Sequence, residues 1–196
     1  RERDELAAEL PADPVEALAI ELSHPRWLVA RWVARWGADA TRALLEANNR
    51  EAPLIVRPWG VVREQLEAML ESAGVGTEDV PLVADSLQLA PGTVLISLGA
   101  FEQGRCFVQD PAATLVTQYA AIPPGSRVAD LCAAPGGKTV ELARTADYVT
   151  AADVSEARLV RLQETIDRLE LEHVTAVVAD VREASLGTFD AVLLDA

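Results

Sequence analysis

The second half of the chain alternates short apolar runs with segments of helical periodicity. Four apolar runs predict β-strands, and three segments of mixed polarity predict helices. One helix precedes the first strand, one follows the first strand and one follows the second. The predicted strands are residues 127–131, 148–152, 174–178 and 189–194, and the predicted helices are 111–121, 138–145 and 155–169. Strands that alternate with helices are typical of a parallel, doubly wound α/β sheet. We therefore expect residues 109–196 to form the first four strands of such a sheet.

The first half carries a mixed pattern that predicts a small α+β domain at residues 23–108. Its predicted helices are residues 26–36, 38–48 and 61–73, and its predicted strands are 54–57, 93–97 and 105–108. Gly37 and Gly74 end two of the helices. Residues 1–22 predict a short helix, a break between Pro11 and Pro14, and a helical segment that leads into the domain.

The sequence Asp-Leu-Cys-Ala-Ala-Pro-Gly-Gly-Lys-Thr, residues 130–139, joins the strand at 127–131 to the helix that follows it. In an α/β sheet such a turn lies at the carboxyl end of a strand, where ligands bind. Gly136 and Gly137 allow a ligand to approach the main chain closely. The free N–H groups at the start of the following helix can bind an anionic or carboxylate group. The turn is therefore a candidate ligand site.

Two familiar phosphate-binding turns do not fit this stretch. A P-loop requires glycine where this chain has Cys132, and the dinucleotide fingerprint Gly-x-Gly-x-x-Gly is absent from the turn.

Lys138 is the only lysine in a chain that has sixteen arginines. Because the compact charge of lysine does not interchange with the planar fork of arginine in a tight site, its position favours a function, with chance placement as the alternative.

Three acids follow the predicted strands: Asp153 after the second, Asp180 after the third and Asp195 after the fourth. The carboxyl ends of parallel strands line one crevice. Asp153 stands 21 residues after Cys132, near the spacing at which an acid binds ribose hydroxyls in nucleotide folds, and Asp180 is placed to orient an adenine. A helix N-cap is the alternative for any single Asp. Three acids at one level favour a nucleoside ligand.

The net charge of the chain is −14, but residues 24–63 hold seven Arg against three acids, a local charge of +4. All four tryptophans, at positions 27, 32, 36 and 59, lie in the same segment. Arginine beside aromatic residues suits phosphate contact and base stacking, so the segment favours an RNA partner. Core packing of most of these tryptophans is the alternative, because Trp32 and Trp36 share a helical face with Leu28.

The composition also bears on the cellular compartment in which the protein acts. The chain has no uncharged apolar run of about 18 residues that would span a membrane, and its charged start lacks the apolar core of a secretion signal. Cys106 and Cys132 form neither a disulfide framework nor a metal-ligand pattern. We expect a cytoplasmic monomer without a metal.

Residues 130–139 resemble motif I of the S-adenosylmethionine-dependent RNA 5-methylcytosine methyltransferases. More narrowly, they resemble the bacterial ribosomal RNA small subunit methyltransferase B family, also called Fmu or Sun. Residues 107–113 resemble the lead-in of that family's catalytic domain. Residues 23–32 and 44–54 resemble the opening of its RNA-binding subdomain. The resemblance covers about residues 14–196 and rests on ten contiguous residues at motif I.

This resemblance implies a class I methyltransferase fold, Rossmann-like and doubly wound, that follows a small α+β RNA-binding subdomain. It implies S-adenosyl-L-methionine as the cofactor, small-subunit ribosomal RNA as the partner, and methylation of cytosine C5. The implied cofactor-binding residues are Cys132, Ala133, Ala134, Pro135, Gly136, Gly137, Lys138, Asp153, Asp180 and Asp195. Asp195 is expected to contact the cytosine ring or the methionine end of the cofactor.

In the family, a cysteine thiolate attacks C6 of cytosine so that C5 can accept the methyl group. That cysteine belongs to a later motif, after a strand that ends in Asp-Ala-Pro-Cys, whereas this chain ends at Asp195 and Ala196. Neither Cys106 nor Cys132 matches the catalytic position. We therefore expect no catalytic residue within the chain, no activity of the chain alone, and an exposed sheet edge that favours aggregation. In the family, the region that matches residues 1–22 would link to an upstream helical RNA-binding domain.

Three other functions compete with this interpretation. The same chemistry can act on transfer RNA or on another ribosomal RNA site. A non-catalytic RNA-binding or assembly factor can keep a cofactor fold. A small-molecule methyltransferase is disfavoured by the arginine- and tryptophan-rich segment.

Overall fold

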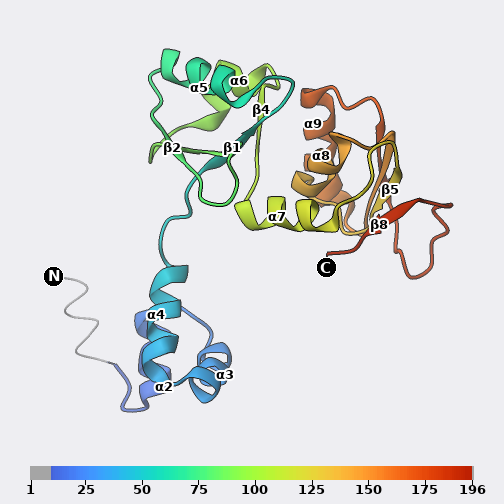
Figure 1. Cartoon of the computed structure of the whole chain (residues 1–196). Coiled ribbons are helices and arrows are strands. Elements are labelled where there is room, and N and C mark those ends of the chain that lie inside the picture. The colour runs from blue at the N-terminus through green and yellow to red at the C-terminus, as the bar shows by residue number, and fades with distance from the viewer. Residues whose placement is uncertain (1–9, 196) are drawn as a thin grey trace. The chain divides into compact units, whose positions relative to one another are not determined.

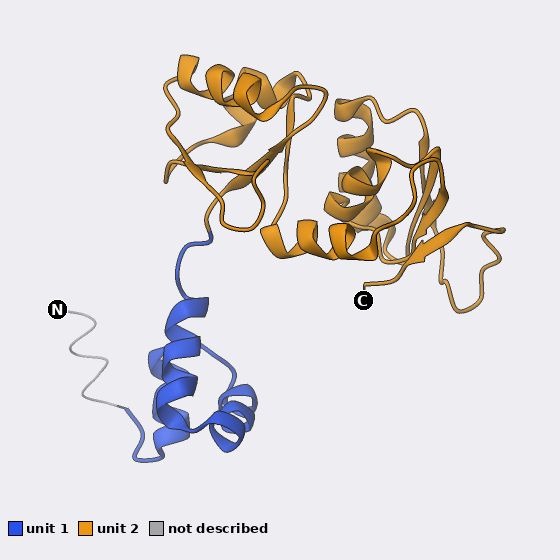
Figure 2. Ribbon diagram, viewed as in Figure 1, with its two compact units in different colours: residues 1–52 blue, residues 53–196 orange. Residues whose placement is uncertain are grey.

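The structure, a computed structural model, describes residues 10–195 and divides the chain into two compact units (Figure 2). Unit 1 is residues 1–52 and unit 2 is residues 53–196. The division at residue 52 falls within the domain predicted at residues 23–108. Its helices predicted at 26–36 and 38–48 belong to unit 1, and its helix predicted at 61–73 and its strands belong to unit 2. The short helix predicted near the N-terminus lies outside the described residues. Between residues 10 and 195, no helix is both long and apolar enough to cross a lipid bilayer.

The described part of unit 1, residues 10–52, is a bundle of three helices: α2 (Pro14–Glu21), α3 (Arg26–Trp36) and α4 (Ala38–Asn48) (Figure 1). The carboxylate of Asp13 accepts the N–H of Val15 at 2.9 Å and caps α2. Each helix buries apolar residues in the common core: Leu18 and Ala19 of α2, Val29 of α3 and Leu45 of α4. The helix bounds agree with the predicted segments at 26–36 and 38–48.

The first part of unit 2 is an antiparallel sheet in the order β2-β3-β1-β4. Its strands are β1 (Ile55–Pro58), β2 (Thr77–Asp79), β3 (Leu87–Leu89) and β4 (Cys106–Val108). The helices of this part are α5 (Arg63–Ser72), the 3-10 turn η1 (Leu95–Ser97) and α6 (Gly99–Glu102). Leu66 and Leu70 of α5 pack against Val56, Leu87 and Cys106 of the sheet.

The strand predicted at residues 93–97 is wrong. This apolar run forms the 3-10 turn η1, in which the N–H of Ser97 bonds to the carbonyl of Val94 at 3.1 Å. Val94 and Ile96 are exposed, so the run supplies no strand face to the core. Sequence patterning also missed β2 and β3, because each has three residues and β2 carries two acids. Strands this short offer too little alternation for a pattern to be recognised.

The second part of unit 2 is a parallel sheet in the order β7-β6-β5-β8, which confirms the predicted α/β fold. Its strands are β5 (Arg127–Asp130), β6 (Tyr148–Asp153), β7 (Val174–Val178) and β8 (Ala191–Leu193). Its helices are α7 (Pro111–Ala120), α8 (Gly137–Ala143) and α9 (Glu156–Leu169). The chain builds outward from β5 through β6 to β7 and then returns to the other side of β5. The strand order thus reverses between β5 and β8, the place where such sheets bind ligands.

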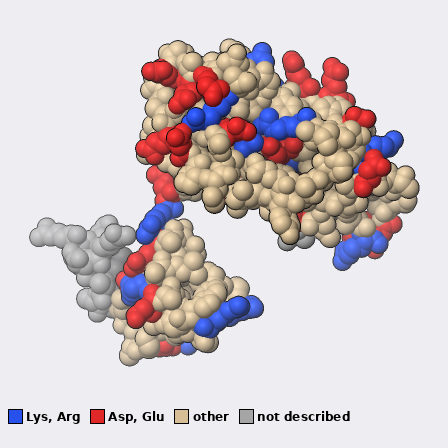
Figure 3. All heavy atoms as spheres, viewed as in Figure 1, with Lys and Arg blue, Asp and Glu red and all other residues tan. Residues whose placement is uncertain are grey.

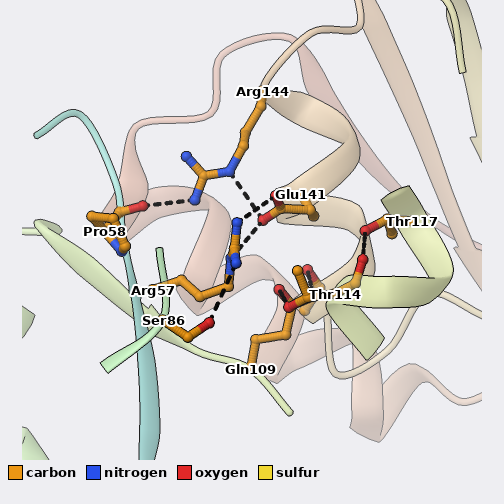
Figure 4. A network of polar contacts seen from close by, with 9 residues as sticks. Arg57, Pro58, Ser86, Gln109, Thr114, Thr117, Glu141 and Arg144 are labelled. Atoms are coloured by element: carbon orange, nitrogen blue, oxygen red, sulfur yellow. Dashed lines mark hydrogen bonds and ion pairs between the residues drawn. The ribbon is translucent and has the colours of Figure 1, made fainter. Parts of the chain in front are cut away.

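Buried polar contacts join the antiparallel sheet to helix α8. Arg57 of β1 forms a two-pronged ion pair with Glu141 of α8, with N–O distances of 2.9 and 3.1 Å (Figure 4). The Arg57 side chain is 2% exposed and that of Glu141 is 9% exposed. Arg144 of the same helix bonds to Glu141 at 3.0 Å and to the carbonyl of Pro58 at 2.7 Å. The antiparallel sheet is therefore joined to α8, which packs against the parallel sheet.

A close backbone approach joins α9 to the turn before β4. A Cβ atom at Gly104 would lie 2.2 Å from the carbonyl oxygen of Arg168, and Gly104 has φ of +67°. Arg168 in turn donates from Nη1 to the carbonyls of Phe101 at 2.9 Å and Cys106 at 2.8 Å. Only glycine fits this conformation and this contact without displacement of α9.

We expect replacement of Glu141 by Gln to lower the free energy of unfolding by about 3 kcal/mol, because Arg57 would stay buried without its charged partner. Urea unfolding followed by circular dichroism measures this. The control is Glu164→Gln at an exposed position of α9, which should change the value by less than about 0.5 kcal/mol. Equal stabilities of the two variants would contradict a structural role for the Arg57–Glu141 pair.

Candidate functional site

The turn between β5 and α8 is fixed to both neighbouring strands. The N–H of Leu131 bonds to the carbonyl of Leu193, the last residue of β8, at 2.9 Å, and the N–H of Ala133 bonds to the carbonyl of Ala152 in β6 at 3.0 Å. Gly136 has φ of +116°, and a Cβ atom there would lie 2.6 Å from Cδ1 of Leu162. Glycine at this position lets the turn pack tightly against α9. The backbone of the turn is therefore held at the carboxyl end of the sheet.

Asp153, the last residue of β6, lies directly beside the turn. Its carboxylate oxygen Oδ2 accepts the N–H of Ala134 at 3.3 Å, which is a long bond. Oδ1 accepts the N–H of Ser155 at 2.9 Å and Nη2 of Arg158 at 2.7 Å. The Asp153 side chain is 1% exposed. One oxygen is thus fully engaged, while Oδ2 keeps capacity to accept a ligand hydroxyl.

Asp195 and Lys138 meet on the other side of β5. Nζ of Lys138 lies 2.8 Å from Oδ2 of Asp195, and both side chains are partly exposed. The pair bridges the α8 end of the turn and the residues that follow β8, across the point where the strand order reverses. The sequence prediction placed both residues in one site, and the structure brings them into contact.

Asp180 lies at the same edge of the sheet, but its carboxylate contacts its own loop. The N–H of Ala179 bonds to the carbonyl of Asp153 at 3.1 Å, so the segment runs beside β6. The guanidinium of Arg182 lies 2.5 Å from Oδ2 of Asp180 and lowers the pKa of that carboxyl from 3.8 to about 2. Asp180 is therefore ionised at neutral pH and paired with an exposed arginine.

Asp130 is a buried acid of the site that sequence analysis did not select. It ends β5, is 1% exposed, and accepts the hydroxyl of Thr139 at 2.8 Å. Burial raises the pKa of Asp130, and the Thr139 hydrogen bond and the charge of Lys138 oppose that rise. The only signal in the sequence was its place at the end of a strand directly before the turn. Its bond to Thr139 fixes the first turn of α8.

The two cysteines differ in their surroundings. Cys106 is buried in β4, and burial raises the pKa of its thiol to about 11. A thiol with that pKa carries almost no thiolate at neutral pH, so Cys106 is not a nucleophile. Cys132 is a free, half-buried thiol within the turn. Among residues 10–195, no cluster of His, Cys, Asp and Glu could hold a metal ion.

These groups suit a ligand that is polar at both ends. A buried carboxylate on one side of β5 can accept hydroxyls, and an ion pair on the other side can exchange contacts with a charged group. The half-buried turn between them offers main-chain atoms at close range. The arrangement is thus one of binding, and Cys132 is the one thiol that the described residues place in the turn.

Two family models match the chain. One is described as 16S rRNA methyltransferase RsmB/F and matches residues 119–196. The other is described as the ferredoxin-like domain of RsmF/B-like methyltransferases and matches residues 24–94.

Curated relatives match almost the whole chain. Ribosomal RNA small subunit methyltransferase B of Pseudomonas syringae pv. tomato is 35% identical, and the match covers 100% of this chain and 44% of that protein. The probable ribosomal RNA small subunit methyltransferase B of Bacillus subtilis is 31% identical, with 94% of this chain and 43% of that protein covered. The chain therefore spans less than half the length of these relatives.

Solved structures show the same fold. NSun6 from Pyrococcus horikoshii, solved with SFG, has a TM-score of 0.79 and 17% identity, over 88% of this chain and 70% of that one. A methyltransferase homolog protein from the same organism has a TM-score of 0.71 and 24% identity, over 87% of this chain and 57% of that one. Fold, family models and curated relatives agree, and the chain belongs to the RsmB/F family of 16S rRNA methyltransferases.

Proposed function

We propose that the chain binds S-adenosylmethionine and forms part of an enzyme that methylates C5 of a cytosine in small-subunit ribosomal RNA. The observation that carries the proposal is the position of Asp153, buried beside the turn of residues 132–138 with one carboxylate oxygen available. Relatives named for methylation of small-subunit ribosomal RNA support the reaction class. The structural neighbour solved with SFG supports a ligand in this fold.

The residues present fit this cofactor. Its ribose hydroxyls would donate to Oδ2 of Asp153, which has only the long bond from Ala134. Its amino-acid end would then extend across β5 toward Lys138 and Asp195, the pair on the opposite side of the turn. Asp180 would take part at the adenine end, through its side chain after release from Arg182 or through neighbouring backbone. The cofactor supplies the methyl group.

Activation of cytosine requires a nucleophile, and neither Cys106 nor Cys132 matches the position of the catalytic cysteine in the family that the sequence resembles. We propose that a cysteine thiolate elsewhere in the longer protein attacks C6, which makes C5 electron-rich. Cys106 is excluded by its burial and raised pKa. The role proposed for this chain is therefore to hold the cofactor and, through Asp195, to contact the base or the methionine end of the cofactor.

Unit 1 offers a surface for the RNA. Trp27 of α3 is 67% exposed, and Arg31, one helical turn later, is exposed on the same face. Neither residue is needed for the core, whereas Trp32 packs against it, so the packing alternative holds for Trp32 and not for Trp27. Aromatic rings that stack on unpaired bases beside a phosphate-binding arginine are typical of single-stranded RNA recognition.

Acidic side chains argue against RNA contact at α5 and β2. Figure 3 shows them gathered on the face of unit 2 that carries these two elements. They are Glu64, Glu67, Glu71, Glu78 and Asp79. Repulsion between these carboxylates and phosphates leaves α3 as the better docking surface.

Replacement of Asp153 by Ala should weaken the binding of S-adenosylhomocysteine by one to two orders of magnitude, because a charge-assisted hydrogen bond contributes about 1.5–3 kcal/mol. Isothermal titration calorimetry on this chain measures the dissociation constant. The matched control is Asp190→Ala. Asp190 also accepts a backbone N–H, that of Arg127 at 2.8 Å, but at the opposite end of the sheet.

In the Asp190→Ala control, the dissociation constant of S-adenosylhomocysteine should stay within about twofold of that of the unchanged chain. An unchanged dissociation constant in Asp153→Ala would remove Asp153 from the site. No binding by the unchanged, folded chain would overturn the proposed cofactor.

Replacement of Trp27 by Leu should weaken the binding of a labelled single-stranded RNA by about tenfold, since stacking contributes about 1–3 kcal/mol per base. Fluorescence anisotropy at fixed salt measures the affinity. Tyr119→Leu is the control, because Tyr119 is also an exposed aromatic residue, 93% exposed on α7. Equal losses in both variants would contradict a specific role for α3.

In the longer protein that includes the downstream cysteine, Asp195→Ala should lower the methylation rate of cytosine in 16S rRNA by at least about tenfold, through loss of the charged contact. Transfer of a labelled methyl group measures the rate, and Asp190→Ala again serves as the control. Turnover at the unchanged rate would exclude Asp195 from the reaction.

A further inference from the structure

Gln109 is a buried polar residue that contacts the turn and has no role so far. It lies between β4 and α7 and is 3% exposed. Its side-chain Nε2 donates to the carbonyl of Gly137 at 2.9 Å. A Cβ atom at Gly137 would lie 3.6 Å from both Cγ and Nε2 of Gln109, so the side chain rests directly against the backbone of the turn.

Thr114 fixes which way the Gln109 amide points. The hydroxyl of Thr114, itself fully buried in α7, donates to Oε1 of Gln109 at 2.8 Å (Figure 4). With Oε1 occupied as an acceptor, the amide presents its N–H donor to Gly137. Thr117 donates to the carbonyl of Thr114 at 2.7 Å and completes a buried chain of polar contacts within α7.

The bond to Gly137 sets the orientation of one peptide plane in the turn. Since a peptide unit is planar, the direction of the Gly137 carbonyl fixes the direction of the N–H of Lys138. Lys138 is also the residue whose side chain pairs with Asp195. Gln109 therefore contacts the turn at the peptide that joins Gly137 to Lys138.

The rest of α8 is anchored to the same part of unit 2. The Arg57–Glu141 pair and the Arg144 bond to Pro58 hold the helix at its later turns. Gln109 holds it at its start. Gln109 follows β4 directly, and β4 pairs with β1, which carries Arg57 and Pro58. The antiparallel sheet thus fixes α8 at both ends.

We propose that Gln109 is a positioning residue for the amino-acid end of the cofactor, acting through the Gly137–Lys138 peptide. The inference rests on the proposed S-adenosylmethionine site, in which the ribose lies at Asp153 and the amino-acid end at Lys138. A donor that orients this peptide should matter for ligands that carry the amino-acid group. It should matter little for ligands that end at the ribose.

Calorimetric titration of this chain with two ligands tests the proposal. S-adenosylhomocysteine carries the amino-acid end, and methylthioadenosine lacks it. In Gln109→Met, which keeps the side-chain length without a donor, the dissociation constant of S-adenosylhomocysteine should rise about tenfold. That of methylthioadenosine should change by less than about twofold. Thr117→Val is the control, since it removes a buried hydroxyl of α7 that does not reach the turn.

Thr114→Val provides a milder second variant that leaves Gln109 in place. Loss of the orienting hydroxyl should raise the dissociation constant of S-adenosylhomocysteine about threefold, again without an effect on methylthioadenosine. If circular dichroism shows that Gln109→Met does not fold, the result for Thr114→Val decides whether Gln109 positions the peptide.

Unchanged binding of S-adenosylhomocysteine in the folded variants would overturn the proposal. Equal weakening of both ligands would also overturn it, because it would show a purely structural role. Absence of S-adenosylhomocysteine binding by the unchanged chain is a separate result, which would overturn the cofactor site on which the proposal rests.

Discussion

The buried ion pair between Arg57 and Glu141 is the constraint on which unit 2 depends. A guanidinium that is 2% exposed needs a full set of partners, and Glu141 supplies two oxygens while Ser86 supplies a third at 3.3 Å. Such a pair adds little net stability compared with apolar packing, but it allows only one arrangement of the two sheets. Because Glu141 stands on α8, that arrangement also fixes the helix that begins at the cofactor turn.

The position of the site follows from the strand order. The chain places β6 on one side of β5 and β8 on the other, so residues after these strands converge on the turn from two directions. Asp153 reaches the turn from β6, and Asp195 reaches it from beyond β8. A ligand with two polar ends matches this geometry better than one with a single charge. The proposed ligand, a nucleoside joined to an amino acid, matches the separation of these acids on the two sides of β5.

Sequence patterns predicted the parallel sheet well, because its strands are apolar runs separated by long helices and by glycine and proline. In the antiparallel sheet they found β1 and β4 but missed β2 and β3, which have three residues each, and they assigned the apolar run of η1 to a strand. The turn and the positions of its acids were predictable from spacing. The roles of Asp130 and Gln109 were not, since both depend on burial and on partners, Thr139 and Gly137, that only the folded chain identifies.

The three predicted acids share one edge of the sheet but are not equivalent. The Arg182 side chain that pairs with Asp180 is 83% exposed. Because exposed ion pairs contribute little free energy, a ligand can separate Arg182 from Asp180 at little cost in free energy. Asp153 differs because its carboxylate is buried and also holds the backbone of Ala134 and Ser155. In the proposed site Asp153 would therefore combine a structural and a binding role, whereas Asp180 would be recruited only when the ligand arrives. This difference explains why the buried acid at the end of β6, and not the exposed one, defines where the nucleoside would lie.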